Sequence, residues 1–159
     1  GIILMKKFSY FAVILSLIFL LSSCANKKDV NVNPSDITSD IINTFSEDIS
    51  MSELNSDRIT KYYDIDMEKV ESFSSYIEGS GGFADEVSVF KMKSEDDISA
   101  AKEAIESRIA QRKKDFDGYN SWELDKIEEN CISVQGKYIL FIISDNSKEA
   151  EKIFKDYLK

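Results

Sequence analysis

Hydrophobic positions follow two periods along this chain, and each period predicts a type of secondary structure. Isoleucines and a phenylalanine three or four residues apart predict a first helix that begins near Pro34, with Ser35 or Asp36 as its cap. The same helical spacing recurs four times further along the chain. It predicts helices over residues 52–63, 94–116, 122–129 and 145–158.

Shorter runs rich in β-branched and aromatic residues predict four strands, at 70–77, 86–93, 131–134 and 138–143. The glycine-rich segment 79–82 predicts a flexible connection within the first strand pair, and Gln135-Gly136 predicts a tight turn within the second. Hairpins with helices between them are typical of an antiparallel sheet that carries helices. We therefore expect an α+β fold over residues 36–159: one small domain whose four-stranded sheet is made of two hairpins.

The N-terminal pattern is that of an export signal. We expect translation to start at Met5, ahead of the basic residues Lys6 and Lys7. The segment from Phe8 to Leu21 is uncharged and almost wholly apolar, and it is 14 residues long. That length suits a secretory signal and falls short of the roughly 18–20 residues that cross a bilayer as a helix.

The four residues that end this segment resemble the lipobox of bacterial lipoproteins: Leu21, Ser22, Ser23 and Cys24. The resemblance implies a signal peptide over 1–23, diacylglycerol on the thiol of Cys24, and often a fatty acid such as palmitate on the new amino group. Two or more acyl chains anchor a protein stably, whereas one chain is marginal. Two alternatives remain open: a plain secretory signal cut after Ala25, and an uncleaved signal anchor.

Residues 24–35 read as the lipidated cysteine followed by a flexible polar tether. Removing residues 1–23 would remove two lysines and no acid, which takes the net charge from −9 to −11. An anionic membrane surface repels such a domain. We therefore expect the lipid to hold the protein at the extracytoplasmic face of the cell membrane, with the tether keeping the domain off the bilayer.

The composition excludes several kinds of catalytic and metal-binding site. The chain has no histidine, which excludes Ser-His-Asp and Cys-His catalysis and the common zinc sites. Its acidic balance argues against nucleic acid as a partner. The segment from Asp115 to Asn120 fails the spacing of a calcium loop, and Cys131 has no second thiol to pair with if Cys24 is lipidated. We expect no catalytic constellation, no metal and no cofactor.

Two pairs of residues are the candidates for a binding surface. Arg108 and Arg112 share one helix face and could capture an anion, although basic residues at this end also suit the helix dipole. Tyr119 and Trp122 follow that helix, where aromatic side chains could bind a sugar or a protein, or could pack a loop onto the core.

Several segments resemble the uncharacterised lipoprotein domain, domain-of-unknown-function family 4358, over roughly residues 45–159. They are Tyr62–Asp66, Ala84–Lys91, the helix that carries Arg108 and Arg112, and Gly136–Ser144. The resemblance implies a lipoprotein of Gram-positive, clostridia-type bacteria, with a lipobox ahead of the domain. It implies no activity and no catalytic residue.

The resulting hypothesis is a membrane-anchored lipoprotein whose domain is a non-enzymatic binding or interaction module of the cell envelope, with an envelope protein as its partner. One alternative is a hydrolase or lyase that acts on an envelope polymer through paired carboxylates. The acids available to it are Glu123, Asp125, Glu128 and Glu129. A second alternative is a small-molecule sensor or substrate-binding subunit with an apolar cleft beside the loop at 79–82.

Overall fold

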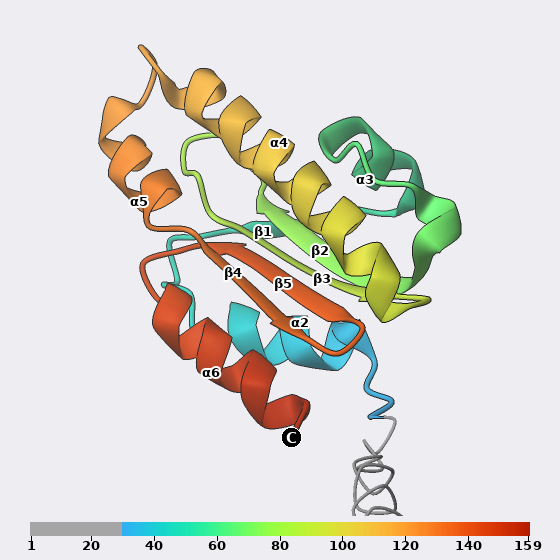
Figure 1. Ribbon diagram of the computed structural model, residues 1–159. Helices are drawn as coiled ribbons and strands as arrows, with labels where there is room; N and C mark the ends of the chain where they lie inside the picture. Colours follow the sequence, from blue (N-terminus) through green and yellow to red (C-terminus); the bar gives the residue numbers. More distant parts are fainter. Residues whose placement is uncertain (1–29) are drawn as a thin grey trace, which may run out of the picture. The chain divides into compact units, whose positions relative to one another are not determined.

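An open antiparallel sheet of five strands in the order β1-β2-β3-β5-β4 forms the centre of the domain in the computed structural model, which describes residues 30–159 (Figure 1). The strands are β1 (Met51–Glu53), β2 (Val70–Glu78), β3 (Glu86–Met92), β4 (Cys131–Gln135) and β5 (Tyr138–Ile143). The expected signal peptide and lipobox lie outside the described residues. Within residues 30–159, no helix is long and apolar enough to cross a membrane.

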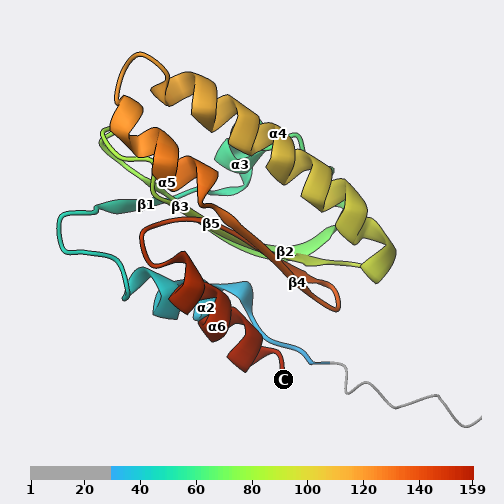
Figure 2. The same ribbon diagram turned by 60° about the vertical axis from the view of Figure 1, so that its left-hand side comes forward.

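Helices cover both faces of the sheet (Figure 2). They are α2 (Pro34–Ile42), α3 (Ser56–Tyr62), α4 (Ile98–Phe116), α5 (Leu124–Glu128) and α6 (Ser147–Tyr157). α2 and α6 lie on one face, and α3, α4 and α5 lie on the other. Because both faces are covered, every residue of β5 is buried, which explains its continuous apolar sequence.

The α+β class is confirmed, but the prediction of four strands is wrong. β1 is the missing strand, and it pairs with β2. Three residues are too few to show the alternation that predicts a strand, and two of them, Ser52 and Glu53, fall within the helix expected over 52–63. Asn33, rather than Ser35 or Asp36, caps α2, because its side-chain oxygen accepts a hydrogen bond from the backbone N–H of Ser35.

The central strand β3 presents two different faces. Val87 and Val89 lie on the side of α2, while Phe90 and Met92 belong to the core cluster on the side of α4. Glu86 shares the α4 side, although it is as buried as the apolar residues around it. A buried carboxylate is costly unless it is paired, so its partners define the first candidate site.

The chain joins the sheet before α2 begins. The Tyr138 hydroxyl accepts a hydrogen bond from the N–H of Val32 at 2.9 Å and donates one to the carbonyl of Val32 at 3.0 Å. Lys91 donates to the side-chain oxygen of Asn31 at 2.8 Å. These contacts hold residues 31–32 against the sheet, within the segment expected to be a flexible tether.

Candidate functional site

A cluster of charged side chains, here called the ion cluster, is buried between β3 and α4. The carboxylate of Glu86 accepts hydrogen bonds from Nε and Nη2 of Arg108 at 3.0 and 2.8 Å, and the Glu86 side chain is 0% exposed. Nε of Arg112 lies 3.3 Å from the same carboxylate. Because the two arginines are four residues apart on α4, one helix face turns both toward the sheet.

Hydroxyl groups complete the ion cluster. Tyr63 donates a hydrogen bond to Oε1 of Glu86 at 2.5 Å, and its oxygen lies 2.9 Å from the hydroxyl of Ser88. Ser88 in turn lies 2.6 Å from the hydroxyl of Ser75 on β2. The Glu86 carboxylate therefore links β3 to α4 and to the residue that follows α3, and the Tyr63, Ser88 and Ser75 hydroxyls extend the network to β2.

Burial and the Glu86 charge shift the pKa of Tyr63 in the same direction and the pKa values of the two arginines in opposite directions. Burial raises the pKa of Tyr63, and the neighbouring Glu86 carboxylate raises this pKa further, so the hydroxyl stays a donor. Burial alone would lower the pKa of Arg108, but Glu86 outweighs it and the pKa is raised. Burial lowers the pKa of Arg112 despite Glu86. Arginine has so high an ordinary pKa that both guanidinium groups remain charged at neutral pH.

The loop between β2 and β3 is tied to this cluster and to itself. Glu78 accepts backbone hydrogen bonds from Ser80 and Gly81 at 2.7 and 2.9 Å. Nη2 of Arg112 donates to the carbonyl of Phe83 at 3.3 Å. The connection expected to be flexible is therefore held by its own hydrogen bonds. A Cβ on its first glycine, Gly79, would lie 2.5 Å from the Ser52 hydroxyl oxygen, so a larger residue there would require the Ser52 side chain to rotate.

A second loop, between α4 and α5, is bonded to the first. Asn120 donates to the carbonyl of Gly82 at 2.6 Å, and Glu123 accepts from the N–H of Ala84 at 2.8 Å. The two loops together present three exposed aromatic residues, here called the aromatic surface: Phe83, Tyr119 and Trp122, which are 37%, 66% and 70% exposed. Large aromatic side chains left in solvent on fixed loops are typical of contact surfaces.

A second group of paired charges adjoins the aromatic surface, because Nζ of Lys126 lies 5.8 Å from the ring centre of Phe83. Nζ of Lys126 lies 3.0 Å from a carboxylate oxygen of Asp85 and 3.1 Å from one of Glu123. Burial raises the pKa of Asp85, and Lys126 opposes this rise. Asp85 and Glu123 are thus two carboxylates that share one ammonium group.

The structure separates the residues that were expected to form one binding surface. Tyr119 and Trp122 are exposed, as a binding surface requires. Arg108 and Arg112 are buried, at 4% and 6% exposed, so the prediction that they contribute to that surface is wrong. The anion that they capture is Glu86 of the same chain.

The burial of Arg108 and Arg112 could have been predicted from the sequence of α4. The buried face of α4 comprises Ala101, Ala104, Ile105, Arg108, Arg112 and Phe116. Both arginines continue the apolar stripe at helical spacing, which predicts a buried partner of opposite charge. Phe83 was also missed, and its one signal is an aromatic residue placed directly after a run of glycines.

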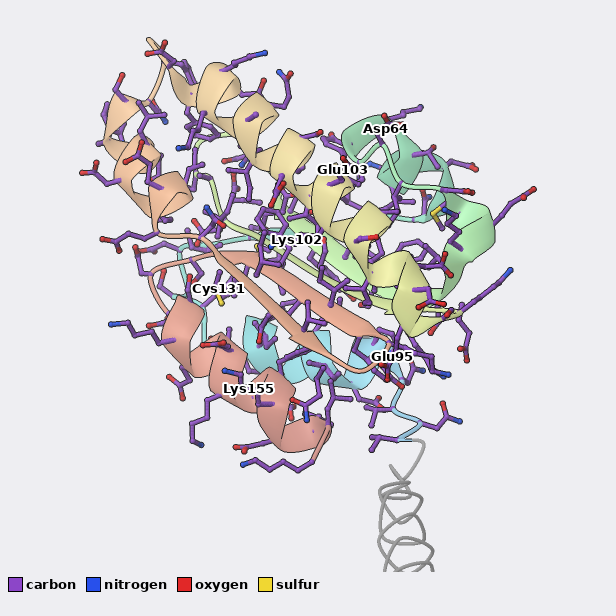
Figure 3. All side chains as sticks on the ribbon, in the orientation of Figure 1. Asp64, Glu95, Lys102, Glu103, Cys131 and Lys155 are labelled. Carbon is purple, nitrogen blue, oxygen red and sulfur yellow. The ribbon has the colours of Figure 1, made fainter. Side chains whose placement is uncertain are left out.

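The remaining candidates from the sequence are the acids of the expected carboxylate face and Cys131. Among the acids of the expected carboxylate face, Glu123 is buried, while Asp125, Glu128 and Glu129 are exposed. Cys131 is a free thiol that lies on the side of the sheet covered by α6, the helix that carries Lys155 (Figure 3). Burial, with Glu151, raises the pKa of Cys131, which disfavours the reactive thiolate. Within residues 30–159, no three acidic or cysteine side chains are grouped as metal ligands would be.

Fold and site together define a small α+β domain with a buried ion cluster and an exposed aromatic surface. The chain belongs to the family described as "Domain of unknown function (DUF4358)", whose profile matches residues 43–144. The resemblance seen in the sequence is thereby confirmed. The match includes the whole sheet and both loops of the aromatic surface, and it ends short of α2 and α6. Comparisons with curated proteins and with solved structures give no match.

Proposed function

We propose that this chain is a lipid-anchored protein of the extracytoplasmic membrane face, and that its domain is a non-enzymatic binding module of the cell envelope. The observation that carries the proposal is the aromatic surface. Trp122 and Tyr119 are about two-thirds exposed, although their loops are fastened by hydrogen bonds. A surface that is already ordered loses little entropy on binding, so its aromatic residues can contribute most of their contact energy.

The charged groups close to this surface support binding rather than catalysis. Glu86 is enclosed by two arginines and a tyrosine. Asp85 and Glu123 are held by Lys126, which keeps a cation between the two carboxylates. A glycosidase needs one carboxylate to attack or activate water and the other to deliver a proton, and a shared ammonium favours neither role.

The anchor is proposed from the sequence of residues 5–24. We expect Cys24→Ala to release the protein from the membrane fraction, because the variant loses its only site for thioether-linked lipid and the second acylation that follows cleavage. Fractionation after a carbonate wash measures this, and Cys131→Ser serves as the matched control, because it removes the other cysteine of the chain. Equal membrane retention of Cys24→Ala and the control would contradict the anchor.

The binding role is tested at the aromatic surface. We expect the full-length double variant Tyr119→Ala/Trp122→Ala to bind an envelope partner at least about thirtyfold more weakly, because an exposed aromatic at the centre of an interface contributes about 2 kcal/mol or more. The matched control is Lys148→Ala/Glu149→Ala, which truncates two exposed side chains of α6. Pull-down from detergent-solubilised envelope measures both variants, and equal recovery by both would contradict this surface.

The hydrolase or lyase alternative requires a pair of carboxylates. It would use Asp85, whose pKa is raised by burial, together with Glu123 beside the aromatic surface. Incubating the wild-type protein and Asp85→Asn with cell-wall fragments distinguishes the two functions. Release of products by the wild type, lost in Asp85→Asn, would replace the binding proposal by the enzymatic one.

A further inference from the structure

Among residues 30–159, the strand β4 forms an open edge of the sheet. It pairs with β5 on one side and is the last strand in the sheet order, on the margin opposite to β1 (Figures 1 and 2). The N–H of Met92 bonds to the carbonyl of Lys137, so the backbone groups of Lys137 turn toward β3. Because successive residues alternate in direction, the backbone groups of Tyr138, Leu140 and Ile142 turn toward β4. By alternation, the backbone groups of Cys131, Ser133 and Gln135 turn toward β5, and those of Ile132 and Val134 turn outward.

In the part of the chain that the structure describes, this edge lacks three of the devices that usually prevent strands from pairing. Its five residues, Cys-Ile-Ser-Val-Gln, contain no charge and no proline, and they pair with β5 in an unbroken register without a bulge. Val134 is 45% exposed and lies on the edge itself. The other margin is different, because β1 has only three residues and carries Glu53, which makes it a poor template.

We propose that a second copy of this chain pairs with β4 in the antiparallel sense, about a two-fold axis at Ser133. In that register Ile132 lies opposite Val134 of the second copy, and Val134 lies opposite its Ile132. These are the two residues whose backbone groups turn outward, so both pairs exchange their N–H and C=O groups. The pairs also place β-branched apolar side chains side by side, which stabilises antiparallel strands.

The charges flanking β4 favour a second copy over an unrelated peptide. Glu129 is the nearest charged residue before the strand, and Lys137, whose Nζ also lies 3.7 Å from Glu71 on β2 of the same chain, is the nearest after it. Antiparallel pairing brings the acidic end of each β4 beside the basic end of the other. The interface is self-complementary and closes on itself, so it gives a dimer with one continuous sheet rather than a growing filament.

Cysteine cross-linking in membranes tests the register. In a Cys131→Ser parent of the full chain, Ser133→Cys is expected to form a disulfide-linked dimer on mild oxidation, because facing residues of a non-hydrogen-bonded pair have Cα atoms about 4.5 Å apart. Val134→Cys is the matched control, because two residues 134 are offset by two positions and lie beyond disulfide reach. The Cys131→Ser parent retains Cys24, so any dimer that it forms measures disulfides through Cys24 alone. Comparison with the parent therefore gives the same answer whether or not Cys24 is lipidated.

A dimer from Ser133→Cys with little from Val134→Cys supports the proposal. No dimer from either variant overturns it, and so does an equal yield from both, because equal yields indicate random collision. A different peptide on β4 would block the edge and leave Ser133→Cys without a disulfide-linked dimer of this chain, which also overturns pairing with a second copy.

Light scattering of the detergent-solubilised full chain tests the same interface without cysteine chemistry. Val134→Lys is expected to raise the dissociation constant of the dimer by about tenfold or more, since both apolar cross-strand pairs are lost. Thr60→Lys adds the same charge at an exposed residue of α3, away from β4 and from the aromatic surface, and should leave the dimer unchanged. A monomeric wild type, or equal weakening by the two variants, would contradict the proposal.

Discussion

Replacing Glu86 with Gln is expected to lower the free energy of unfolding by about 3–5 kcal/mol, because the change leaves two buried guanidinium groups without a negative partner. Arg108 and Arg112 are 3% and 8% exposed at their side chains and cannot turn to solvent without moving α4 off the sheet. The amide of Gln has the size of the carboxylate, so the loss measures charge rather than shape. Since a domain of this size is stable by about 5–15 kcal/mol, the variant loses a large part of that stability.

Urea denaturation followed by circular dichroism measures this loss, with Glu106→Gln as the matched control. Glu106 is also on α4, but its side chain is 58% exposed and faces Lys102 at 4.0 Å. Exposed pairs of this kind contribute about 0.5 kcal/mol or less. If both variants unfold at the same urea concentration, the ion cluster does not stabilise the fold.

The ion cluster also connects the fold with the aromatic surface. Arg112 lies between the two, with Nε near Glu86 and Nη2 donating to the carbonyl of Phe83. The loop that carries Phe83 is bonded in turn to the loop that carries Tyr119 and Trp122. Loss of the Glu86 charge therefore releases the support of the proposed binding surface as well as the packing of α4.

The sequence predicted the long elements because their periods are carried by many residues. The continuous apolar run of β5 could only be a strand covered on both faces, and its bounds match those expected, Tyr138–Ile143. β1 could not be predicted, because three residues define no period, and its pairing depends on β2, which lies about 20 residues further along the chain.

The candidate site was predicted only in part, for a related reason. Tyr119 and Trp122 could be located because large aromatics after a helix-ending glycine stand out in one stretch of sequence. Glu86 was overlooked because it is the first residue of a strand, and in the sequence it resembles an exposed polar residue at the end of an alternating polar and apolar pattern. Its importance depends on Arg108, which is distant in sequence and reaches the same face of the sheet only after folding.

Above pH 10 the domain is expected to lose stability through Tyr63. Burial and the Glu86 carboxylate hold the pKa of this hydroxyl well above its ordinary value in the folded state, whereas the unfolded chain ionises near pH 10. A raised folded-state pKa contributes stability that is full below the unfolded pKa and is lost as the pH rises past it. While the folded hydroxyl stays protonated, each further pH unit costs about 1.4 kcal/mol.

Tyr63→Phe separates this effect from the general alkaline loss. At neutral pH the variant is expected to be less stable by about 1–3 kcal/mol, because Glu86 loses a buried hydrogen-bond donor. Between pH 9 and pH 11.5 it should lose about 2 kcal/mol less than the wild type, since it has no buried phenol to ionise. Tyr119→Phe is the control, as this ring is 66% exposed. If all three proteins show the same alkaline slope in urea denaturation, Tyr63 is not the group that limits stability at high pH, and its ionisation is tolerated beside Glu86.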